Sequence, residues 1–274
     1  MQNIITNYKL INKIGHGSYG EVWKASHINT NKLVAIKLER KNKSTSTLKY
    51  ETIILRHLRE LSRVVNIKYY GEINDYNYLI MDLLESNINS YYNSKLRIVD
   101  TEYHKLKEIG IQMMECISDI HNKGIVHRDI KPSNFMLDSK NIVCLIDFGL
   151  AKQYITPNGH HRQNSKCNRV VGTIRYTSLY VHRGNTYSRR DDIISFVYVI
   201  IYLLRGTLPW QGINFDNKHQ KVDKVYNLKN NILICELCKF LPNKIEELLT
   251  YAYSLSYYDE PNYDYIIFLL KTIT

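Results

Sequence analysis

The sequence predicts an α+β fold with two lobes, a small antiparallel-sheet lobe with one helix followed by a larger, mostly helical lobe. Strand-like runs and a single helical pattern occupy about residues 1–84, whereas apolar residues at helical spacing dominate about residues 87–274. A length of 274 residues accommodates both lobes in one domain with a shared cleft. We therefore expect a single domain over residues 1–274.

The composition indicates a basic protein without a membrane span. The formal net charge is +11, which favours polyanionic partners: nucleic acid, an acidic membrane surface, or phosphorylated and acidic proteins. The sequence has no long basic run, and we predict no specific nucleic-acid binding. The longest apolar run, Ile193 to Leu204, is too short to cross a bilayer and suits a buried helix. Since no secretory signal is visible and the five cysteines are odd in number, we expect an intracellular protein, cytoplasmic or nuclear.

The stretch GHGSYGEV, residues 15–22, has glycines spaced as in phosphate-binding loops. This G-x-G-x-x-G spacing occurs in dinucleotide-binding Rossmann folds and in the nucleotide-covering loop of protein kinases, and an ordinary glycine-rich turn is the third alternative. A Rossmann fold needs a helix after the glycines. Here EVWKASHI follows without helical spacing, so two strands joined as a hairpin are expected, which favours the kinase alternative.

After the glycine-rich stretch, predicted strands alternate with helices, and the later part of the chain is predicted to be mostly helical. Residues 48–61 have apolar side chains near helical spacing, and LKEIGIQMMECISDIH is amphipathic. The polar stretch at 152–169 carries a proline and a glycine and is typical of a long loop. The predicted elements are strands at 34–39 and 76–84 and helices at 48–61 and 106–121.

Lys37 lies in the apolar strand-like run VAIK, where a lysine is unusual unless its ammonium has anionic partners. Protein kinases use such a lysine to hold the α- and β-phosphates of ATP, and they pair it with a glutamate from a helix. Glu51, in LKYETIIL, stands where that glutamate is expected. Taken alone, the two residues have the alternative interpretation of solvated surface charges.

The stretch HRDIKPSNF is the strongest functional signal in the chain. Asp129 would accept or orient the proton of a substrate hydroxyl, and Lys131 would offset charge on a transferring phosphoryl group. Asn134 would present an amide oxygen to Mg²⁺, and Asp147, in IDFGLAK, would hold Mg²⁺ through its carboxylate. The order and spacing of these motifs predict phosphoryl transfer from ATP with Mg²⁺.

With these motifs in place, the sequence resembles the casein kinase I family of serine/threonine protein kinases from about Tyr8 to Leu270. GTIRYTS is the most diagnostic stretch, because general kinases carry Ala-Pro-Glu near it and none occurs here. The resemblance implies the two-lobed protein kinase fold and a Ser or Thr acceptor. It further implies that Asp192, in SRRDD, supports the backbone of the HRD turn. The chain departs from the family at Ser178-Leu179-Tyr180, which lacks an asparagine, and at Val197, which replaces a glycine.

The resemblance also implies residue roles. The catalytic residues are Asp129, Lys131 and Asn134, and the metal ligands are Asn134 and Asp147. An anion site for acidic or pre-phosphorylated protein substrates falls on Arg175, Gly212 and Lys221. The ATP contacts fall on Ile14, Gly15, Gly17, Ser18, Gly20, Val22, Ala35, Lys37, Glu51, Met81, Asp82 and Leu84.

Two other functions stay open at this point. A pseudokinase-like scaffold would use the basic face for binding alone, and a kinase of small molecules would use the same cleft for another acceptor. The presence of Lys37, Asp129 and Asp147 favours an active enzyme over the scaffold. The match through GTIRYTS and LPWQG favours a protein acceptor over a small molecule.

Overall fold

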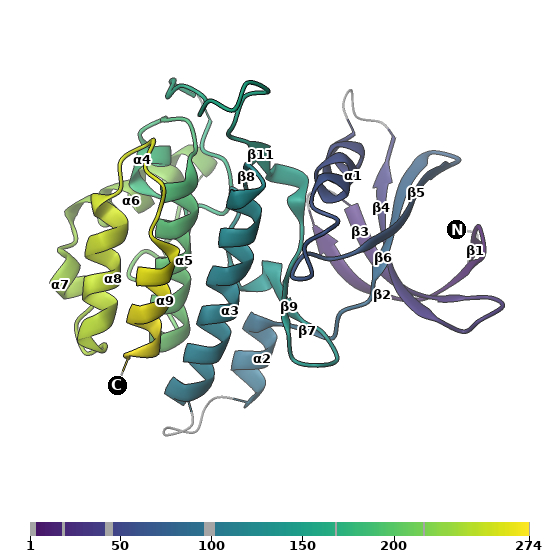
Figure 1. Ribbon diagram of the computed structural model, residues 1–274, viewed down its shortest axis with the longest axis horizontal. Coiled ribbons are helices and arrows are strands. Elements are labelled where there is room, and N and C mark those ends of the chain that lie inside the picture. Colours follow the sequence, from purple (N-terminus) through teal and green to yellow (C-terminus); the bar gives the residue numbers. More distant parts are fainter. Residues whose placement is uncertain are drawn as a thin grey trace. The chain divides into compact units, whose positions relative to one another are not determined.

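Figure 1 shows an antiparallel sheet with one helix in the N-terminal part of the chain and mostly helices in the C-terminal part, which confirms the predicted α+β architecture. The chain divides into a first unit, Met1–Ser86 with Met136–Gly149, and a second unit, Asn87–Phe135 with Leu150–Thr274. The computed structural model describes residues 4–17, 20–41, 46–95, 102–167, 169–215 and 217–273.

Strand β4 (Leu33–Arg40) has two different faces within the sheet of the first unit. Because side chains alternate along a strand, Val34, Ile36 and Leu38 share one face and pack in an apolar core. Lys37 and Glu39 lie on the opposite face and bond to helix α1 (Thr47–His57). The sheet has the order β1-β2-β3-β4-β6-β5, with the other strands at Ile4–Ile5, Tyr8–Gly17, Gly20–His27, Tyr76–Asp82 and Ile67–Ile73.

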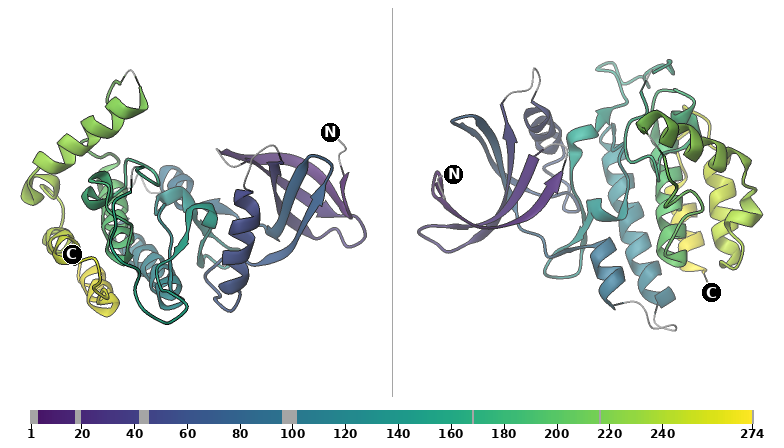
Figure 2. Two further views of the ribbon diagram at one scale, coloured as in Figure 1. Left: turned by 90° about the horizontal axis from the view of Figure 1, so that it is seen from above. Right: turned by 180° about the vertical axis from the view of Figure 1, so that it is seen from behind.

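Helix α1 forms where the sequence supplies both a cap and an apolar stripe. The Ser46 side chain accepts a hydrogen bond from the backbone N–H of Lys49 at 3.1 Å, which satisfies one of the free donors of the first turn. Leu48 and Leu55 are buried one and two turns along. Figure 2 shows the helix running along one side of the sheet, where it contacts β5 and β6.

The segment Met136–Gly149 belongs to the first unit through backbone hydrogen bonds. The N–H of Leu145 donates to the carbonyl of Arg63 at 2.9 Å, and the N–H of Glu85 donates to the carbonyl of Leu137 at 2.9 Å. No pattern in the sequence indicates this pairing, because it depends on contacts between distant segments. The strands and 3₁₀ helix near this segment are β7 (Ser86–Asn87), β9 (Phe135–Leu137), β10 (Val143–Leu145) and η2 (Phe148–Leu150).

Helix α5 (Arg189–Arg205) forms the core of the second unit and confirms the buried helix expected for the longest apolar run. It begins with a capping box between Ser188 and Asp191 and ends at Gly206. Helices α3 (Glu102–Asn122) and α8 (Asn243–Ser254) contact it, and α9 (Tyr263–Lys271) contacts both of these (Figure 1). The remaining elements are α2 (Ile88–Lys95), β8 (Ile125–Val126), η1 (Pro132–Asn134), β11 (Lys152–Gln153), α4 (Leu179–His182), α6 (Lys218–Asn231) and α7 (Ile234–Leu237).

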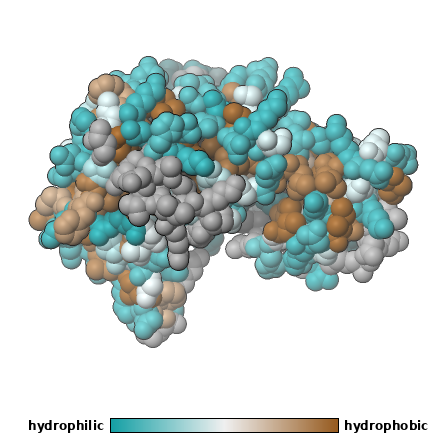
Figure 3. Space-filling model, turned by 90° about the horizontal axis from the view of Figure 1, so that it is seen from below, coloured by the Kyte–Doolittle hydropathy of each residue, from teal (hydrophilic) through white to brown (hydrophobic). Residues whose placement is uncertain are grey.

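The surface of the protein carries both hydrophilic and apolar residues. On the coloured part of the face drawn in Figure 3, hydrophilic residues are widespread and apolar patches lie between them. Across the described ranges, no helix combines the length and the apolar character needed to cross a membrane.

Gly20 is required by the backbone at the start of β3, whereas Gly15 is not. Gly20 has φ +135°, and a Cβ there would lie 1.9 Å from the carbonyl oxygen of Leu38. A Cβ on Gly15 would meet Val22 at an ordinary 3.5 Å. We expect Gly20→Ala to lower the free energy of unfolding by about 1–3 kcal/mol, the usual cost of a strained backbone, and Gly15→Ala to change it far less. Urea unfolding of both variants measures the difference in stability. Equal stabilities of the two variants would contradict the requirement for glycine at position 20.

Candidate active site

The glycine-rich stretch forms the predicted hairpin between β2 and β3. Gly15 lies opposite Val22 and Gly17 lies opposite Gly20 in the antiparallel register. A strand follows the glycines, so the Rossmann alternative, which needs a helix there, is wrong. Ser18, the remaining loop residue predicted to contact ATP, falls outside the described residues.

The other residues expected near ATP lie on three strands of the same sheet and just beyond it. Ala35 on β4 pairs with Met81 on β6, and both are buried. Asp82 is the last residue of β6, and Leu84 follows it half-buried. Ile14, on β2, has 47% of its surface exposed. The sheet register thus pairs Ala35 with Met81, and Ile14 and Leu84 belong to the same unit.

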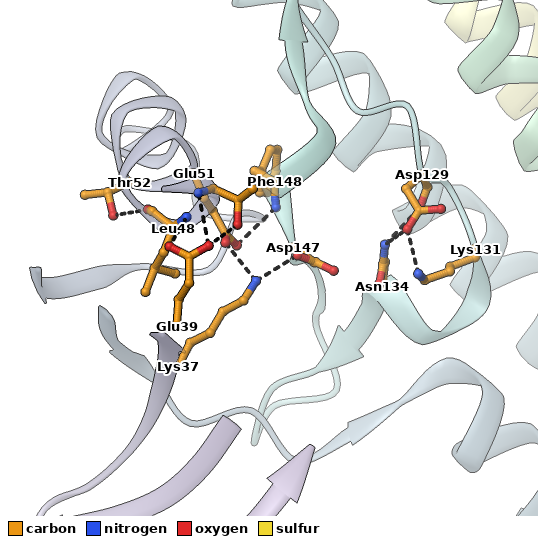
Figure 4. A network of polar contacts seen from close by, with 11 residues as sticks. Lys37, Glu39, Leu48, Glu51, Thr52, Asp129, Lys131, Asn134, Asp147 and Phe148 are labelled. Atoms are coloured by element: carbon orange, nitrogen blue, oxygen red, sulfur yellow. Dashed lines mark hydrogen bonds and ion pairs between the residues drawn. The ribbon is translucent and has the colours of Figure 1, made fainter. Parts of the chain in front are cut away.

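Lys37 is buried. Figure 4 shows its side chain between two carboxylates. Its Nζ lies 2.7 Å from Oε2 of Glu51 and 2.8 Å from Oδ1 of Asp147. Burial alone would lower the pKa of Lys37, but the two carboxylates raise it above its ordinary value, so the ammonium stays charged. Glu51 also accepts a hydrogen bond from the N–H of Phe148 at 3.2 Å. The expected pairing of Lys37 with Glu51 is therefore present, and it extends to Asp147.

The loop that carries the HRD stretch holds the carboxylate of Asp129 between several donors within the second unit (Figure 4). Oδ2 of Asp129 accepts from Nζ of Lys131 at 2.6 Å and from Nδ2 of Asn134 at 3.4 Å. Asn134 donates more closely, at 2.9 Å, to the backbone carbonyl of Asp129. The three residues that the sequence predicted as catalytic thus contact one another around Asp129.

Thr173 contacts Asp129 as well, and the sequence analysis missed it. Its N–H and its hydroxyl donate to Oδ1 of Asp129 at 2.8 and 2.7 Å. Gly172 permits this approach, because a Cβ there would lie 2.3 Å from the carbonyl oxygen of Arg128. The Gly-Thr pair that opens GTIRYTS was the available signal, but only the folded chain shows which carboxylate it meets.

Asp192 supports the HRD turn, as the resemblance implies. This fully buried carboxylate accepts the backbone N–H of His127 at 2.7 Å and that of Arg128 at 3.0 Å. Arg128 has a φ of +68°, a conformation that few residues other than glycine adopt. The hydrogen bonds from α5 therefore fix a strained backbone immediately before Asp129.

The divergent stretch Ser178-Leu179-Tyr180 is anchored to the start of α5. The hydroxyl of Ser178 bonds to the carboxylate of Asp191, and the guanidinium carbon of Arg190 lies 3.5 Å from the centre of the Tyr180 ring. A cation this close to an aromatic face is stabilising. These side chains fix the segment without the asparagine found in the family. Val197, the second departure, is fully buried in α5.

Lys229 is a second residue that the sequence analysis missed. It is buried on α6, and its Nζ donates to the carbonyls of Ile174 at 2.9 Å and Thr177 at 2.6 Å. The same nitrogen lies 4.9 Å from the centre of the Tyr198 ring. Burial lowers the pKa of Lys229 well below its ordinary value. Its hydrogen bonds hold the main chain on both sides of Arg175.

The three residues of the expected anion site line one groove of the second unit, with a volume of about 710 Å³. The indole of Trp210 donates to the backbone carbonyl of Arg175 at 2.7 Å. Lys221 lies with its Nζ 4.6 Å from the ring centre of Phe215, and Gly212 has a φ of +73° that suits glycine. Lys131, two residues after Asp129, lines the same groove.

We expect Lys229→Met to destabilise the protein. Methionine has a similar length but no donor, so two buried carbonyls lose a hydrogen bond, at a cost of about 1–3 kcal/mol. Lys224→Met is the control, because Lys224 is exposed on the same helix and donates to the carbonyl of Asn214. Chemical unfolding of both variants measures the loss, and a Lys229→Met protein as stable as the wild type would contradict this role.

Comparison with known proteins agrees with this geometry. Residues 8–256 match the protein kinase domain family. The chain is 33% identical over 273 residues to casein kinase I homolog 3 of Schizosaccharomyces pombe, and the match covers 97% of this chain and 62% of that protein. The chain thus spans less than two thirds of the length of this relative. The chain therefore belongs to the protein kinase family, and it is similar to a casein kinase I homolog.

Proposed function

We propose that the chain is an ATP-dependent serine/threonine protein kinase that phosphorylates acidic or already phosphorylated proteins. One observation carries the proposal: the charged groups that phosphoryl transfer needs are all present and paired. Lys37 lies between Glu51 and Asp147, and Asp129 lies beside Lys131. A scaffold without activity has no need to keep Lys37 buried and charged.

The side chains fit ATP and Mg²⁺. The hairpin of β2 and β3 carries glycines, and because glycine has no Cβ, backbone N–H groups there could approach phosphate oxygens closely. Lys37 is a fixed cation suited to the α- and β-phosphates. Asp147 and Asn134 offer a carboxylate and an amide oxygen, the hard ligands that Mg²⁺ prefers. When bound, ATP supplies the phosphoryl group and Mg²⁺ offsets its negative charge.

Asp129 would accept or orient the proton of the substrate hydroxyl. Thr173 donates two hydrogen bonds to one of its oxygens and Lys131 donates to the other, so the carboxylate is oriented before a substrate binds. Lys131 would also offset the charge that develops on the transferred group. Asp192 holds the backbone that carries Asp129, and it thereby acts on orientation and not on the proton itself.

Acidic or phosphorylated substrates are proposed because Arg175, Lys221 and Lys131 line the same groove. The planar guanidinium of Arg175 suits phosphate through two parallel hydrogen bonds, and the backbone of Gly212 permits close approach. A substrate could therefore place its acceptor hydroxyl near Lys131 and an upstream anion near Arg175 within one groove. By the same resemblance to casein kinase I, we propose an intracellular location.

Three substitutions test the chemistry. Lys37→Met removes the phosphate-binding cation, Asp129→Asn removes the carboxylate that acts on the hydroxyl, and Asp147→Asn weakens metal binding. We expect each to lower kcat/KM for phosphorylation of casein by at least about a hundredfold, as is typical when acid–base or electrostatic catalysis is lost. Asp75→Asn, on the exposed turn between β5 and β6, is the control and should keep the wild-type rate.

Near wild-type rates in all three variants would show that the active site is misassigned. Measuring ATP consumption with casein and, separately, with a panel of small hydroxyl metabolites distinguishes the other functions. Consumption with neither substrate would favour the scaffold, and consumption with metabolites alone would favour a small-molecule kinase.

The anion site is tested with two peptides that differ only in a phosphoserine upstream of the acceptor. We expect Arg175→Ala to weaken phosphorylation of the primed peptide by about 1.5–3 kcal/mol, the range for hydrogen bonds to charged groups, and to leave the unprimed peptide nearly unchanged. Added salt should reduce the preference, because the groove is open to solvent. Arg183→Ala is the control, since this exposed arginine bonds to Asn230 and is not among the residues that line the groove. Equal wild-type rates for the two peptides would overturn the site and leave the kinase assignment intact.

A further inference from the structure

Helix α1 is bonded to strand β4 at two points, through two side chains of opposite charge. Lys37 and Glu39 are two residues apart and so lie on the same face of β4. Lys37 pairs with Glu51 in the middle of α1, whereas Glu39 reaches the start of the helix, as Figure 4 shows. Only the first contact belongs to the active site described above.

Glu39 bonds to the first turn of α1 with both carboxylate oxygens. Oε1 accepts from the backbone N–H of Thr47 at 3.0 Å and also from its hydroxyl. Oε2 accepts from the hydroxyl of Ser46 at 2.5 Å and from the N–H of Leu48 at 3.2 Å. The carboxylate therefore satisfies two of the backbone donors that a helix leaves free at its start.

The charge of Glu39 also complements the helix. The first turn of α1 contains no acidic residue, so the negative charge that favours a helix start comes from the sheet. Glu39 has only 1% of its surface exposed. Burial alone would raise the pKa of Glu39, but hydrogen bonds from Ser46, Thr47 and Leu48 lower it, so the side chain remains a carboxylate.

We propose that Glu39 is a positioning residue for the active site: it fixes the first turn of α1 so that Glu51, one turn later, meets Lys37. Glu39 holds the first turn of α1 and Lys37 holds its middle, so the two contacts together fix the rotation of the helix against β4, in addition to its packing on β5 and β6. The proposal rests on the proposed role of Lys37 in binding ATP. It adds that the position of α1 is set within this unit by Glu39.

Glu39→Gln tests the proposal. Glutamine keeps the size of the side chain but turns one acceptor oxygen into an NH₂ group, which faces donors of Ser46, Thr47 or Leu48. We expect kcat/KM for ATP to fall about tenfold, within the range for losing hydrogen bonds to a charged group, while KM for the peptide stays unchanged. Backbone amide hydrogen exchange over residues 47–57 should accelerate.

Glu72→Gln is the matched control. Glu72 lies on β5 of the same sheet, and it pairs with Lys41, outside α1, in an exposed ion pair. The same substitution there removes a carboxylate charge but leaves the hydrogen bonds at the first turn of α1 in place. We expect Glu72→Gln to match the wild type in kcat/KM and in the exchange of α1.

Two results would overturn the proposal. The first is unchanged kcat/KM and unchanged exchange in Glu39→Gln. The second is a lower melting temperature with unchanged kcat/KM per folded molecule, which would show that Glu39 only stabilises the fold. If the wild type transfers no phosphate, the proposed function fails, but the exchange of α1 still decides whether Glu39 holds the helix.

Thr47→Val provides a milder test in case Glu39→Gln does not fold. Valine keeps the shape of threonine and removes only the hydroxyl that donates to Glu39. We expect a loss of about two- to threefold in kcat/KM for ATP, in line with one hydrogen bond. In a Glu39→Gln background that does fold, Thr47→Val should add little, because the two residues act through one contact. An unchanged rate in the single variant, or fully additive losses in the double variant, would contradict the proposal.

Discussion

The buried ammonium of Lys37 is the constraint on which the first unit depends. A charge removed from water is tolerated only when opposite charges and hydrogen bonds replace the lost hydration. Lys37 meets this requirement with Glu51 and Asp147, which lie 14 and 110 residues away along the chain. The sheet, helix α1 and the segment that carries Asp147 therefore have to pack together before the lysine can be buried. The fold of this unit and its proposed phosphate-binding group thus depend on the same contacts.

The second unit also contains a buried charged group whose lost hydration is replaced by hydrogen bonds, the carboxylate of Asp192. Asp192 has no exposed surface and accepts backbone N–H groups of the HRD turn, together with Nε2 of His121 at 3.0 Å. It thereby compensates for the strain of Arg128. Thr173 and Lys229 bond the segment that carries Arg175 to Asp129 and to α6. The main chain around Arg175 in the groove is therefore held by several hydrogen bonds, which would suit the proposed binding of a substrate in one orientation.

The sequence predicted the elements with strong periodicity and the residues that belong to motifs. The glycine hairpin, the pair of Lys37 and Glu51 and the support from Asp192 follow from local patterns or from the resemblance to casein kinase I. Lys229 escaped prediction because nothing in KVYNLKNN distinguishes a lysine that folds inward from one that faces water. Glu39 escaped for a related reason, since a charged residue near the end of a strand is usually solvated. The roles of both depend on contacts made only after folding.

The alternation along β4 also constrains how the sheet can assemble. A slip of one residue in the pairing of this strand would exchange its two faces. Lys37 and Glu39 would then enter the apolar core of Val34, Ile36 and Leu38, and aliphatic side chains would face the donors of α1. The charges would then be buried without partners, and the donors of α1 would lose their acceptors. Each of these changes costs free energy, so a sheet with the wrong register is destabilised by both. The pair of charges that organises the proposed active site therefore also specifies the strand register during folding.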